Sequence, residues 1–189
     1  MKMTSWAWKA PLYSRVRRLP FFKNLLASEQ KKLAGLFEHV PQPVGLHLDV
    51  GSGTGDSLSL FQAGKVLICM DASLAMLHQL PYSPKLLARA ELLPFADQSV
   101  DFVSALGVLE YVPEAPAFFQ EIRRVLRPQR FFLFTSSPPI WANQMRGIWG
   151  ERLYLRSSQK VKQLFKQSGW RECGHTCTWL QEQWLLWRE

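Results

Sequence analysis

The sequence predicts an α/β fold built on a mostly parallel sheet. Between residues 44 and 136, short apolar runs alternate with stretches of helical character, which is the order of consecutive βαβ units. The first of these apolar runs ends on a glycine-rich turn, residues 51–55. At 189 residues, with 47% hydrophobic and 20% charged residues, the chain has the length and composition of one globular domain. We therefore expect residues 1–189 to form a single domain.

The elements of this central region are expected in a regular order. Each strand is a short apolar run, and each helix carries apolar residues three or four positions apart, as Phe118, Phe119, Ile122 and Val125 do. Pro81 ends the second helix, because proline cannot continue one. The strands are expected at residues 44–50, 65–70, 85–90, 99–106 and 130–136, and the helices at residues 56–63, 72–79 and 116–126.

Two segments outside this region are strongly basic. Residues 1–40 hold eight Lys or Arg and two Glu, and residues 137–167 hold six Lys or Arg and one Glu, whereas the rest of the chain is slightly acidic. Such clusters attract anionic partners, although a solvated basic face without a partner gives the same pattern. We expect residues 1–40 to form a basic helical cap and residues 137–156 to form a lid loop. Further helices are expected at residues 24–39 and 159–167, and further strands at residues 170–176 and 178–187.

Composition also limits the cellular setting and the metal chemistry of the chain. No stretch of eighteen apolar residues occurs, and residues 1–8 lack the apolar run of a signal peptide, so we expect a cytoplasmic protein. The three cysteines are an odd number without framework spacing, which fits a reducing compartment. Cys173, His175 and Cys177 resemble a zinc set, but residues two apart on a strand lie about 6.5 Å from each other, too far to share one ion. We therefore expect no metal site.

The glycine-rich turn indicates a ligand with a positive charge. A loop of this kind after a first strand lets a ligand approach the backbone, and the helix behind it directs its positive end at that ligand. The dinucleotide fingerprint would place glycine at position 56, but that residue is Asp56, and the third glycine is Gly55. Asp49 stands two residues before the first glycine. Its carboxylate would repel a pyrophosphate and would bind an ammonium group through a charge-assisted hydrogen bond.

A second carboxylate, Asp71, lies twenty residues after Gly51, at the end of the second strand. An acidic residue in this position accepts hydrogen bonds from ribose hydroxyls in dinucleotide sites. Adenosine attached to a cationic amino acid would therefore satisfy both Asp49 and Asp71. Two other interpretations stay open: the glycines also suit an ordinary turn between strand and helix, and Asp71 alone could cap the helix before Ser73.

Four sequence motifs follow one another in this region. They are Leu48-Asp49-Val50-Gly51-Ser52-Gly53-Thr54-Gly55, then Met70-Asp71-Ala72-Ser73, then Ala90-Glu91-Leu92-Leu93-Pro94-Phe95 with Ser99-Val100-Asp101-Phe102-Val103, and Glu121-Ile122-Arg123-Arg124-Val125-Leu126-Arg127-Pro128. In this order they resemble the motifs of the class I S-adenosylmethionine (SAM)-dependent methyltransferases, particularly the small-molecule group that includes the ubiquinone and menaquinone biosynthesis enzymes. The resemblance spans roughly residues 44–136 and says little about the substrate.

The resemblance implies a Rossmann-like three-layer sandwich with a seven-stranded, mostly parallel sheet whose last strand is antiparallel. It also implies that the chain binds SAM and releases S-adenosylhomocysteine (SAH). On the matching positions, Asp49 would hold the ammonium group, Asp71 the ribose, and Leu106 would lie beneath the sulfonium. The residues that the resemblance implies for the cofactor are Asp49, Gly51, Ser52, Gly53, Thr54, Gly55, Asp71, Ala72, Ala90, Glu91 and Leu106.

Three positions depart from the pattern of this family. Gln129-Arg130 stands where the family usually has Gly-Gly after Pro128, in a turn remote from the cofactor, and we expect no functional loss from it. Arg89 stands before Ala90, where the family often has Asp or Asn facing adenine, so recognition of the adenine amino group would depend on the backbone. Tyr13-Ser14 stands where relatives have a Tyr-Asp pair, which removes one polar group from the expected substrate entrance.

No residue stands out as a general base. Methyl transfer from a sulfonium needs such a base only if the acceptor starts protonated, as a phenol does. Tyr13, Glu110, Tyr111 and His175 are the candidates, because they are expected near the strand ends where ligands bind in open α/β sheets. Each of the four also suits a purely structural role.

Tryptophans mixed with basic residues give the best indication of the methyl acceptor. Trp6, Trp8, Trp141 and Trp149 lie in the two basic segments, and they suit an aromatic or lipid-like acceptor, an anionic membrane surface or stacked RNA bases. We favour a small-molecule acceptor. The first alternative is an RNA or protein methyltransferase, and the second is a non-catalytic SAM- or SAH-binding protein with a regulatory or assembly role. The acceptor atom and the oligomeric state are left open.

Overall fold

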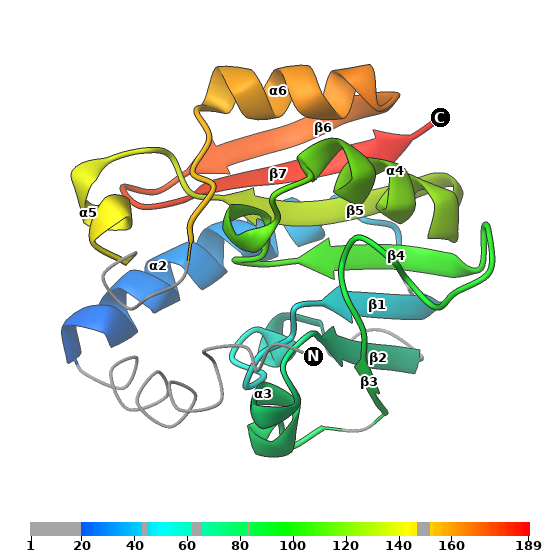
Figure 1. Ribbon diagram of the computed structural model, residues 1–189, viewed down its shortest axis with the longest axis horizontal. Coiled ribbons are helices and arrows are strands. Elements are labelled where there is room, and N and C mark those ends of the chain that lie inside the picture. Colours follow the sequence, from blue (N-terminus) through cyan, green and yellow to red (C-terminus); the bar gives the residue numbers. More distant parts are fainter. Residues whose placement is uncertain (1–19, 43–44, 62–65, 83, 147–151) are drawn as a thin grey trace.

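The computed structural model describes residues 20–42, 45–61, 66–82, 84–146 and 152–189. Its seven strands form one sheet in the order β3-β2-β1-β4-β5-β7-β6 (Figure 1). Strands β1 to β5 pair in parallel, and β7 pairs antiparallel with both β5 and β6, so the expected sheet is confirmed. The strands are β1 (Leu46–Val50), β2 (Val66–Asp71), β3 (Lys85–Leu87), β4 (Val100–Ala105), β5 (Leu126–Ser136), β6 (Trp170–Cys177) and β7 (Glu182–Arg188).

Helical elements cover both faces of the sheet, which gives the three expected layers (Figure 1). Helices α4 and α6 contact each other on one face, and α2 packs with the 3-10 turn η1 on the other. The described helical elements are α2 (Pro20–Phe37), η1 (Leu58–Phe61), α3 (Leu74–Gln79), η2 (Leu109–Tyr111), α4 (Ala115–Val125), α5 (Trp141–Gln144) and α6 (Ser158–Gln167).

Local sequence signals set the ends of α4 and α6. Pro116 stands in the first turn of α4, where a missing backbone N–H costs nothing. The Ser157 side chain caps α6 by accepting a hydrogen bond from the backbone N–H of Lys160. Gly169, with a φ of 76°, follows the end of α6 and lets the chain turn back into β6.

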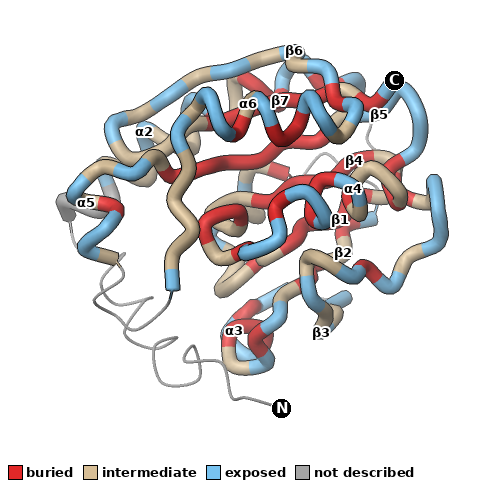
Figure 2. Tube along the Cα trace, turned by 45° about the horizontal axis from the view of Figure 1, so that its top comes forward, coloured by how far each residue is buried: buried red, intermediate tan, exposed pale blue. Residues whose placement is uncertain are grey.

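The sheet separates two apolar layers, and the buried residues follow its central strands (Figure 2). Because successive side chains of a strand point to opposite faces, Leu48 and Val50 of β1 join the layer under α4, whereas His47 and Asp49 face α2 and η1. Fully buried rings in the first layer are Phe118, Phe119, Phe132, Phe134, Phe165 and Trp184. The rings around His47 in the second layer are Phe37, Phe61 and Phe102.

The prediction of a helix at residues 56–63 is wrong for the residues of this segment that the structure describes. Only η1 forms there, and its hydrogen bonds span three residues, as from the Leu60 N–H to the Ser57 carbonyl. Ser57 and Ser59 account for the difference, because serine side chains compete for backbone groups and weaken an α-helix.

Two other segments are more structured than the sequence predicts. Strand β5 begins at Leu126 and not at residue 130, and it passes through Gln129 with a φ of 58°. The segment expected as a lid loop, residues 137–156, contains the short helix α5. Residues 147–151 of that segment, and residues 1–19 of the expected cap, lie outside the described residues, so the lid and the cap stay predictions.

The described parts of the chain contain neither a membrane-spanning helix nor a metal-binding group of side chains. No helix in those parts has both the length and the apolar character needed to cross a bilayer. Within the same residues, no three His, Cys, Asp or Glu side chains are grouped so that they could hold a metal ion. Cys173 and Cys177 are free, exposed thiols on β6.

Candidate functional site

The glycine loop connects β1 to η1 and leaves its backbone open to a ligand. Gly51, Gly53 and Gly55 adopt φ values of 72°, 55° and 89°, which side chains other than glycine rarely allow. A Cβ at Gly51 would lie 2.3 Å from Cγ2 of Val108, whereas the only described atom near one at Gly53 is the Gly51 carbonyl oxygen, 4.0 Å away. The first glycine is thus required by packing, and the second borders open space.

Asp71 joins the end of β2 to this loop. Its Oδ2 accepts a hydrogen bond from the Gly53 N–H over 2.9 Å, and its Oδ1 accepts one from the Ser73 N–H over 2.8 Å. A carboxylate can accept about four hydrogen bonds, so two positions remain for ligand hydroxyls. Burial raises the pKa of Asp71, and the backbone hydrogen bonds of Ser73 and Gly53 oppose that shift. The N-cap of α3 is Ser73, whose side chain accepts from the Met76 N–H, so Asp71 is not that cap.

Asp49 lies beneath the loop and is 1% exposed. Its Oδ1 accepts a hydrogen bond from Ser104 Oγ over 2.5 Å, and that hydroxyl lies 2.8 Å from His47 Nε2. Burial is the largest cause that raises the pKa of Asp49 to about 6, and the charge of Asp71 acts in the same direction. Oδ2 is buried and has no hydrogen-bond partner within the described part of the chain. Contact between Asp49 and a ligand ammonium group stays a prediction.

The segment expected at the adenine edge forms a turn in which Arg89 bridges to Leu92. Arg89 Nη2 lies 3.2 Å from Glu91 Oε1, and the Arg89 side chain is 72% exposed. The arginine that departs from the family pattern is therefore held by the neighbouring carboxylate and solvent. Ala90 is partly buried against the core, which leaves its backbone as the group that this turn can offer to a ligand.

The end of β4 borders a second open space. Gly107 has a φ of 71°, and a Cβ there would meet no heavy atom within 4 Å. Its N–H donates to Thr135 Oγ1 of β5 over 2.7 Å, which fixes the turn. Leu106, expected beneath the sulfonium, is partly buried and packs against the layer on the α2 face.

Glu110, Tyr111, Ser137 and Arg146 form one hydrogen-bonded group, here called the Glu110 cluster. Glu110 Oε1 accepts from Ser137 Oγ and from Arg146 Nη2, each over 3.0 Å. Arg146 Nη2 also donates to the Tyr111 hydroxyl over 3.1 Å. The Glu110 side chain is 1% exposed and that of Arg146 is 39% exposed, so Arg146 is the more exposed partner of this ion pair.

The other predicted base candidates do not join this cluster. His175 lies on the edge strand β6, stacks on Trp184 at 3.8 Å between ring centroids, and pairs with Glu182 at 3.4 Å. Strands β5 and β7 separate it from β4. Tyr13 lies outside the described residues. Ser137 and Arg146 were not among the site residues predicted from the sequence, and the basic segment after β5 was the signal that could have indicated Arg146.

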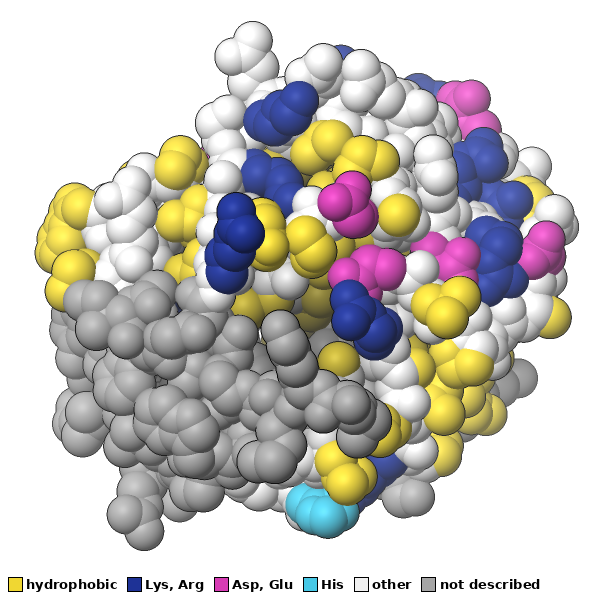
Figure 3. All heavy atoms as spheres, viewed as in Figure 1, with side chains coloured by type: hydrophobic (Ala, Val, Ile, Leu, Met, Phe, Trp, Pro, Cys, Tyr) yellow, Lys and Arg dark blue, Asp and Glu magenta, His cyan; other side chains and the backbone are white. Residues whose placement is uncertain are grey.

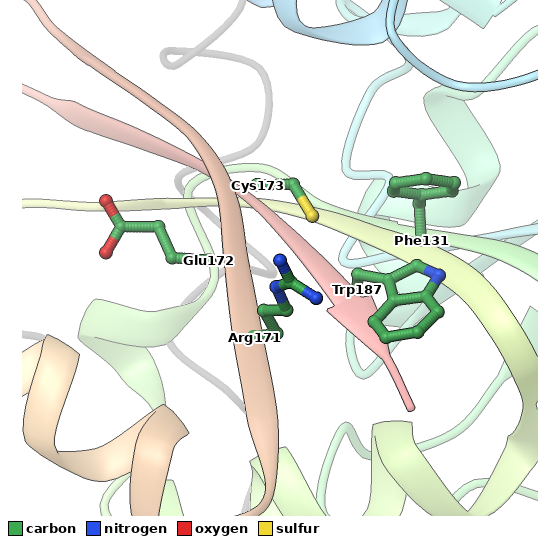
Figure 4. A pocket seen from close by; sticks show the side chains of 5 residues that line it. All are labelled: Phe131, Arg171, Glu172, Cys173 and Trp187. Carbon is green, nitrogen blue, oxygen red and sulfur yellow. The ribbon is translucent and has the colours of Figure 1, made fainter.

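A pocket of about 440 Å³ lies elsewhere, and Phe131, Arg171, Glu172, Cys173 and Trp187 line it (Figure 4). The Glu172 side chain points away from the other four. Phe131, Trp187 and Arg171 lie side by side on β5, β7 and β6, near the end of the sheet opposite to the glycine loop. This pocket is therefore not part of the candidate cofactor site.

Residues 48–134 match the family model described as a methyltransferase domain. The fold is similar to a SAM-dependent methyltransferase from Thermotoga maritima, with a TM-score of 0.75 at 13% identity over 98% of this chain and 100% of that one. It is also similar to magnesium protoporphyrin IX methyltransferase from Synechocystis PCC 6803, solved with bound SAH, with a TM-score of 0.71 at 18% identity over 96% of each chain. Residues 48–134 therefore match a methyltransferase domain, and the described residues have the fold of SAM-dependent methyltransferases.

Two curated proteins match part of this sequence. The chain is 28% identical to malonyl-[acyl-carrier protein] O-methyltransferase from Halorhodospira halophila over 137 residues, which cover 65% of this chain and 46% of that protein. It is 37% identical to the biotin biosynthesis bifunctional protein BioHC from Cellvibrio japonicus over 98 residues, which cover 48% of this chain and 20% of that protein. The matches therefore span less than half the length of these relatives.

Proposed function

We propose that the protein transfers the methyl group of SAM to a small acceptor with an acidic group. The observation that carries the proposal is the glycine loop, with open space at Gly53 and with carboxylates at Asp49 and Asp71. These groups fit the cofactor, because the carboxylates suit its ammonium group and its ribose, and the open backbone admits its methionine portion.

Each part of the site has a defined task in this proposal. Gly51 to Gly55 would hold the methionine portion, Asp71 the ribose, and Ala72, Ala90 and Glu91 the adenine, with Leu106 beneath the sulfonium. The bound cofactor supplies an electrophilic methyl group. The chain contributes orientation of the acceptor and exclusion of water, which account for much of the acceleration of such a displacement.

Arg146 supports an acceptor with a carboxylate. Its side chain is partly exposed, and its guanidinium is held by Glu110, Tyr111 and Ser137. Arginine presents paired donors that match a carboxylate. A carboxylate acceptor is already ionised near neutral pH, so no base is required, in accordance with the engaged and buried Glu110. The names of the relatives, which include a malonyl-[acyl-carrier protein] O-methyltransferase and a porphyrin methyltransferase, also favour a small acidic acceptor.

Two measurements test the proposal. Calorimetry should show binding of SAM and SAH by the purified protein. Transfer of labelled methyl from SAM should then be compared between small carboxylic acids, their thioesters and phenols, and we expect methyl esters as products. No binding of either cofactor would overturn the proposal, and transfer only to phenols would overturn the acidic acceptor.

A non-catalytic SAM-binding protein is the second candidate. The observation that favours it is the ion pair of Arg89 with Glu91. Glu91 is the carboxylate expected at the adenine edge, and this ion pair already engages it. Turnover with any acceptor would exclude this candidate. No observation on the described residues favours an RNA or protein methyltransferase.

Peripheral contact with an anionic membrane is part of the proposal, as is a cytoplasmic location. Trp141 and Trp179 are 70% and 58% exposed and pack edge to face at 6.4 Å between ring centroids. Figure 3 shows apolar side chains gathered at the edge of the molecule that carries α5. Exposed tryptophans near basic residues suit a lipid interface. Sedimentation with anionic liposomes at low salt tests this contact, and no binding would remove it.

A further inference from the structure

A buried polar chain lies beneath the glycine loop. His47 and Asp49 of β1 and Ser104 of β4 are each at most 1% exposed, in a layer formed otherwise largely by apolar side chains. The parallel register of the two strands places Asp49 opposite Ser104. Burial of polar groups costs free energy unless their hydrogen bonds are satisfied, so the chain of contacts between the three side chains is significant.

The two hydrogen bonds between these side chains both donate toward Asp49. Ser104 Oγ donates its single proton to Asp49 Oδ1 over 2.5 Å, so it must accept the hydrogen bond that joins it to His47 Nε2 over 2.8 Å. His47 is thereby fixed as the neutral tautomer with its proton on Nε2, and burial lowers its pKa to about 3. Asp49 is the final acceptor, so these two hydrogen bonds stabilise the ionised form of Asp49.

One oxygen of Asp49 has no partner among the residues that the structure describes. Oδ2 is buried and accepts no hydrogen bond from them, while Ser104 fixes the orientation of the carboxylate through Oδ1. Among the described residues, Asp49 forms no ion pair with a basic side chain. A buried ionised carboxylate without a counter-charge is costly, and binding of a cation nearby relieves that cost.

We propose that Ser104 and His47 are positioning residues for the cofactor. They hold Asp49 ionised and oriented, with Oδ2 free, so that a cationic ligand on the glycine loop meets a negative charge that needs no rearrangement. The inference rests on the proposed function, because the cation is the ammonium-bearing amino acid portion of SAM or SAH.

Few titratable groups face Asp49. Cys69 lies opposite it on β2, and burial raises the pKa of this thiol to about 11, so the thiol stays neutral. Asp71, at the end of β2, is a like charge. The elements over this face, α2 and η1, contribute the apolar Phe37 and Phe61 to the layer around His47.

This arrangement predicts a pH-dependent affinity. Burial raises the pKa of Asp49 to about 6, and the hydroxyls of Ser104 and, to a smaller extent, Ser52 oppose that shift. Affinity for a cationic ligand should therefore fall as the pH decreases through about 6. Removal of the Ser104 hydroxyl raises the pKa of Asp49 further, so the fall should begin at a higher pH.

Calorimetry with two probes tests the inference from about pH 5 to about pH 8. SAH carries the ammonium group, whereas 5′-methylthioadenosine shares the adenosine and lacks the amino acid. Ser104→Ala should weaken SAH binding about tenfold at neutral pH and move the pH midpoint upward. Ser104→Thr keeps the hydroxyl and should retain the wild-type midpoint. Binding of 5′-methylthioadenosine should be equal in all three proteins.

A second pair of variants addresses His47 in the same way. His47→Leu removes the donor to Ser104 and should shift the midpoint upward, whereas His47→Gln keeps an N–H donor and should not. Ser99→Ala is a matched control, because its hydroxyl donates to the Ala96 carbonyl just before β4, far from Asp49.

The outcomes separate this inference from the function on which it rests. SAH binding by the wild type with an unchanged affinity and midpoint in Ser104→Ala would overturn the positioning role and leave the function intact. Equal loss of both probes in Ser104→Ala would indicate general damage to the loop and would also overturn it. No SAH binding by the wild type would overturn the proposed function, and this inference with it.

Discussion

Asp71 ties the second strand to the glycine loop and still has hydrogen-bonding capacity for a ligand. Its two oxygens accept from the N–H groups of Gly53 and Ser73, which fixes the carboxylate at the strand end. A group held in this way loses little conformational entropy when a ribose binds.

Asp71→Ala should therefore weaken SAM binding by about 1.5–3 kcal/mol, the scale of hydrogen bonds to a charged group. Calorimetry measures this difference. Glu114→Gln is a control, since Glu114 is an exposed residue before α4 that makes no side-chain cap. Unchanged SAM affinity in Asp71→Ala would contradict the ribose assignment.

Gly51 and Gly35 form a contrasting pair of glycines. A side chain at Gly51 would have to adopt a φ of 72° and would collide with Val108, whereas a Cβ at Gly35, within α2, would meet nothing within 4 Å. Gly51→Ala should lower the free energy of unfolding by about 1–3 kcal/mol, while Gly35→Ala should raise it by about 0.5–1 kcal/mol. Urea denaturation distinguishes the two, and equal effects would contradict this account.

At the scale of the elements, the strands were easier to predict than the connections between them. Apolar runs identified the central strands β1, β2, β4 and β5, because a buried strand between helices needs no polar face. The 3-10 turn η1 was missed, since serine competition is a local effect that periodicity does not report. Arg146 joins Glu110 from 36 residues away, a long-range contact that no spacing pattern encodes.

Helix α4 also supports the segment that follows the predicted adenine-binding turn. Arg124, in its last turn, donates to the carbonyls of Leu93 and Phe95 and pairs with Glu121 and Asp97. The side chain of this arginine is 33% exposed, so water screens part of the interaction.

Arg124→Ala should lower the free energy of unfolding by about 1–2 kcal/mol, because two partly buried carbonyls and two carboxylates lose a donor. It should also loosen SAM binding through the segment after Glu91. Denaturant unfolding and calorimetry measure the two effects, with the exposed Lys166→Ala on α6 as the control. A variant as stable as Lys166→Ala would show that Arg124 does not support this segment.

At the scale of the whole molecule, His47 contributes to acid sensitivity. Burial lowers its pKa from 6.5 to about 3, so its stabilising contribution is complete above pH 6.5 and is lost as the pH falls. Asp49 has the opposite effect on the pH dependence of stability, because burial raises its pKa from 3.8 to about 6. Its contribution to the free energy of unfolding is therefore complete below about pH 3.8 and is lost as the pH rises through about 6.

Comparison with His47→Gln isolates the histidine, because glutamine does not titrate. Between about pH 5.5 and pH 4, the free energy of unfolding of the wild type should fall relative to the variant by about 1.4 kcal/mol per pH unit. Chemical denaturation at a series of pH values measures both curves. Parallel curves would show that His47 is not the neutral, buried group described above.

The position of β7 has a consequence for synthesis on the ribosome. β7 (Glu182–Arg188) is the last strand in sequence, yet it lies between β5 and β6. A nascent chain that has emerged only as far as residue 177 has no partner for the outer edge of β5, and β6 cannot join the sheet. An unpaired strand edge invites association with other chains, so the period before the last strand emerges is when a chaperone would matter most.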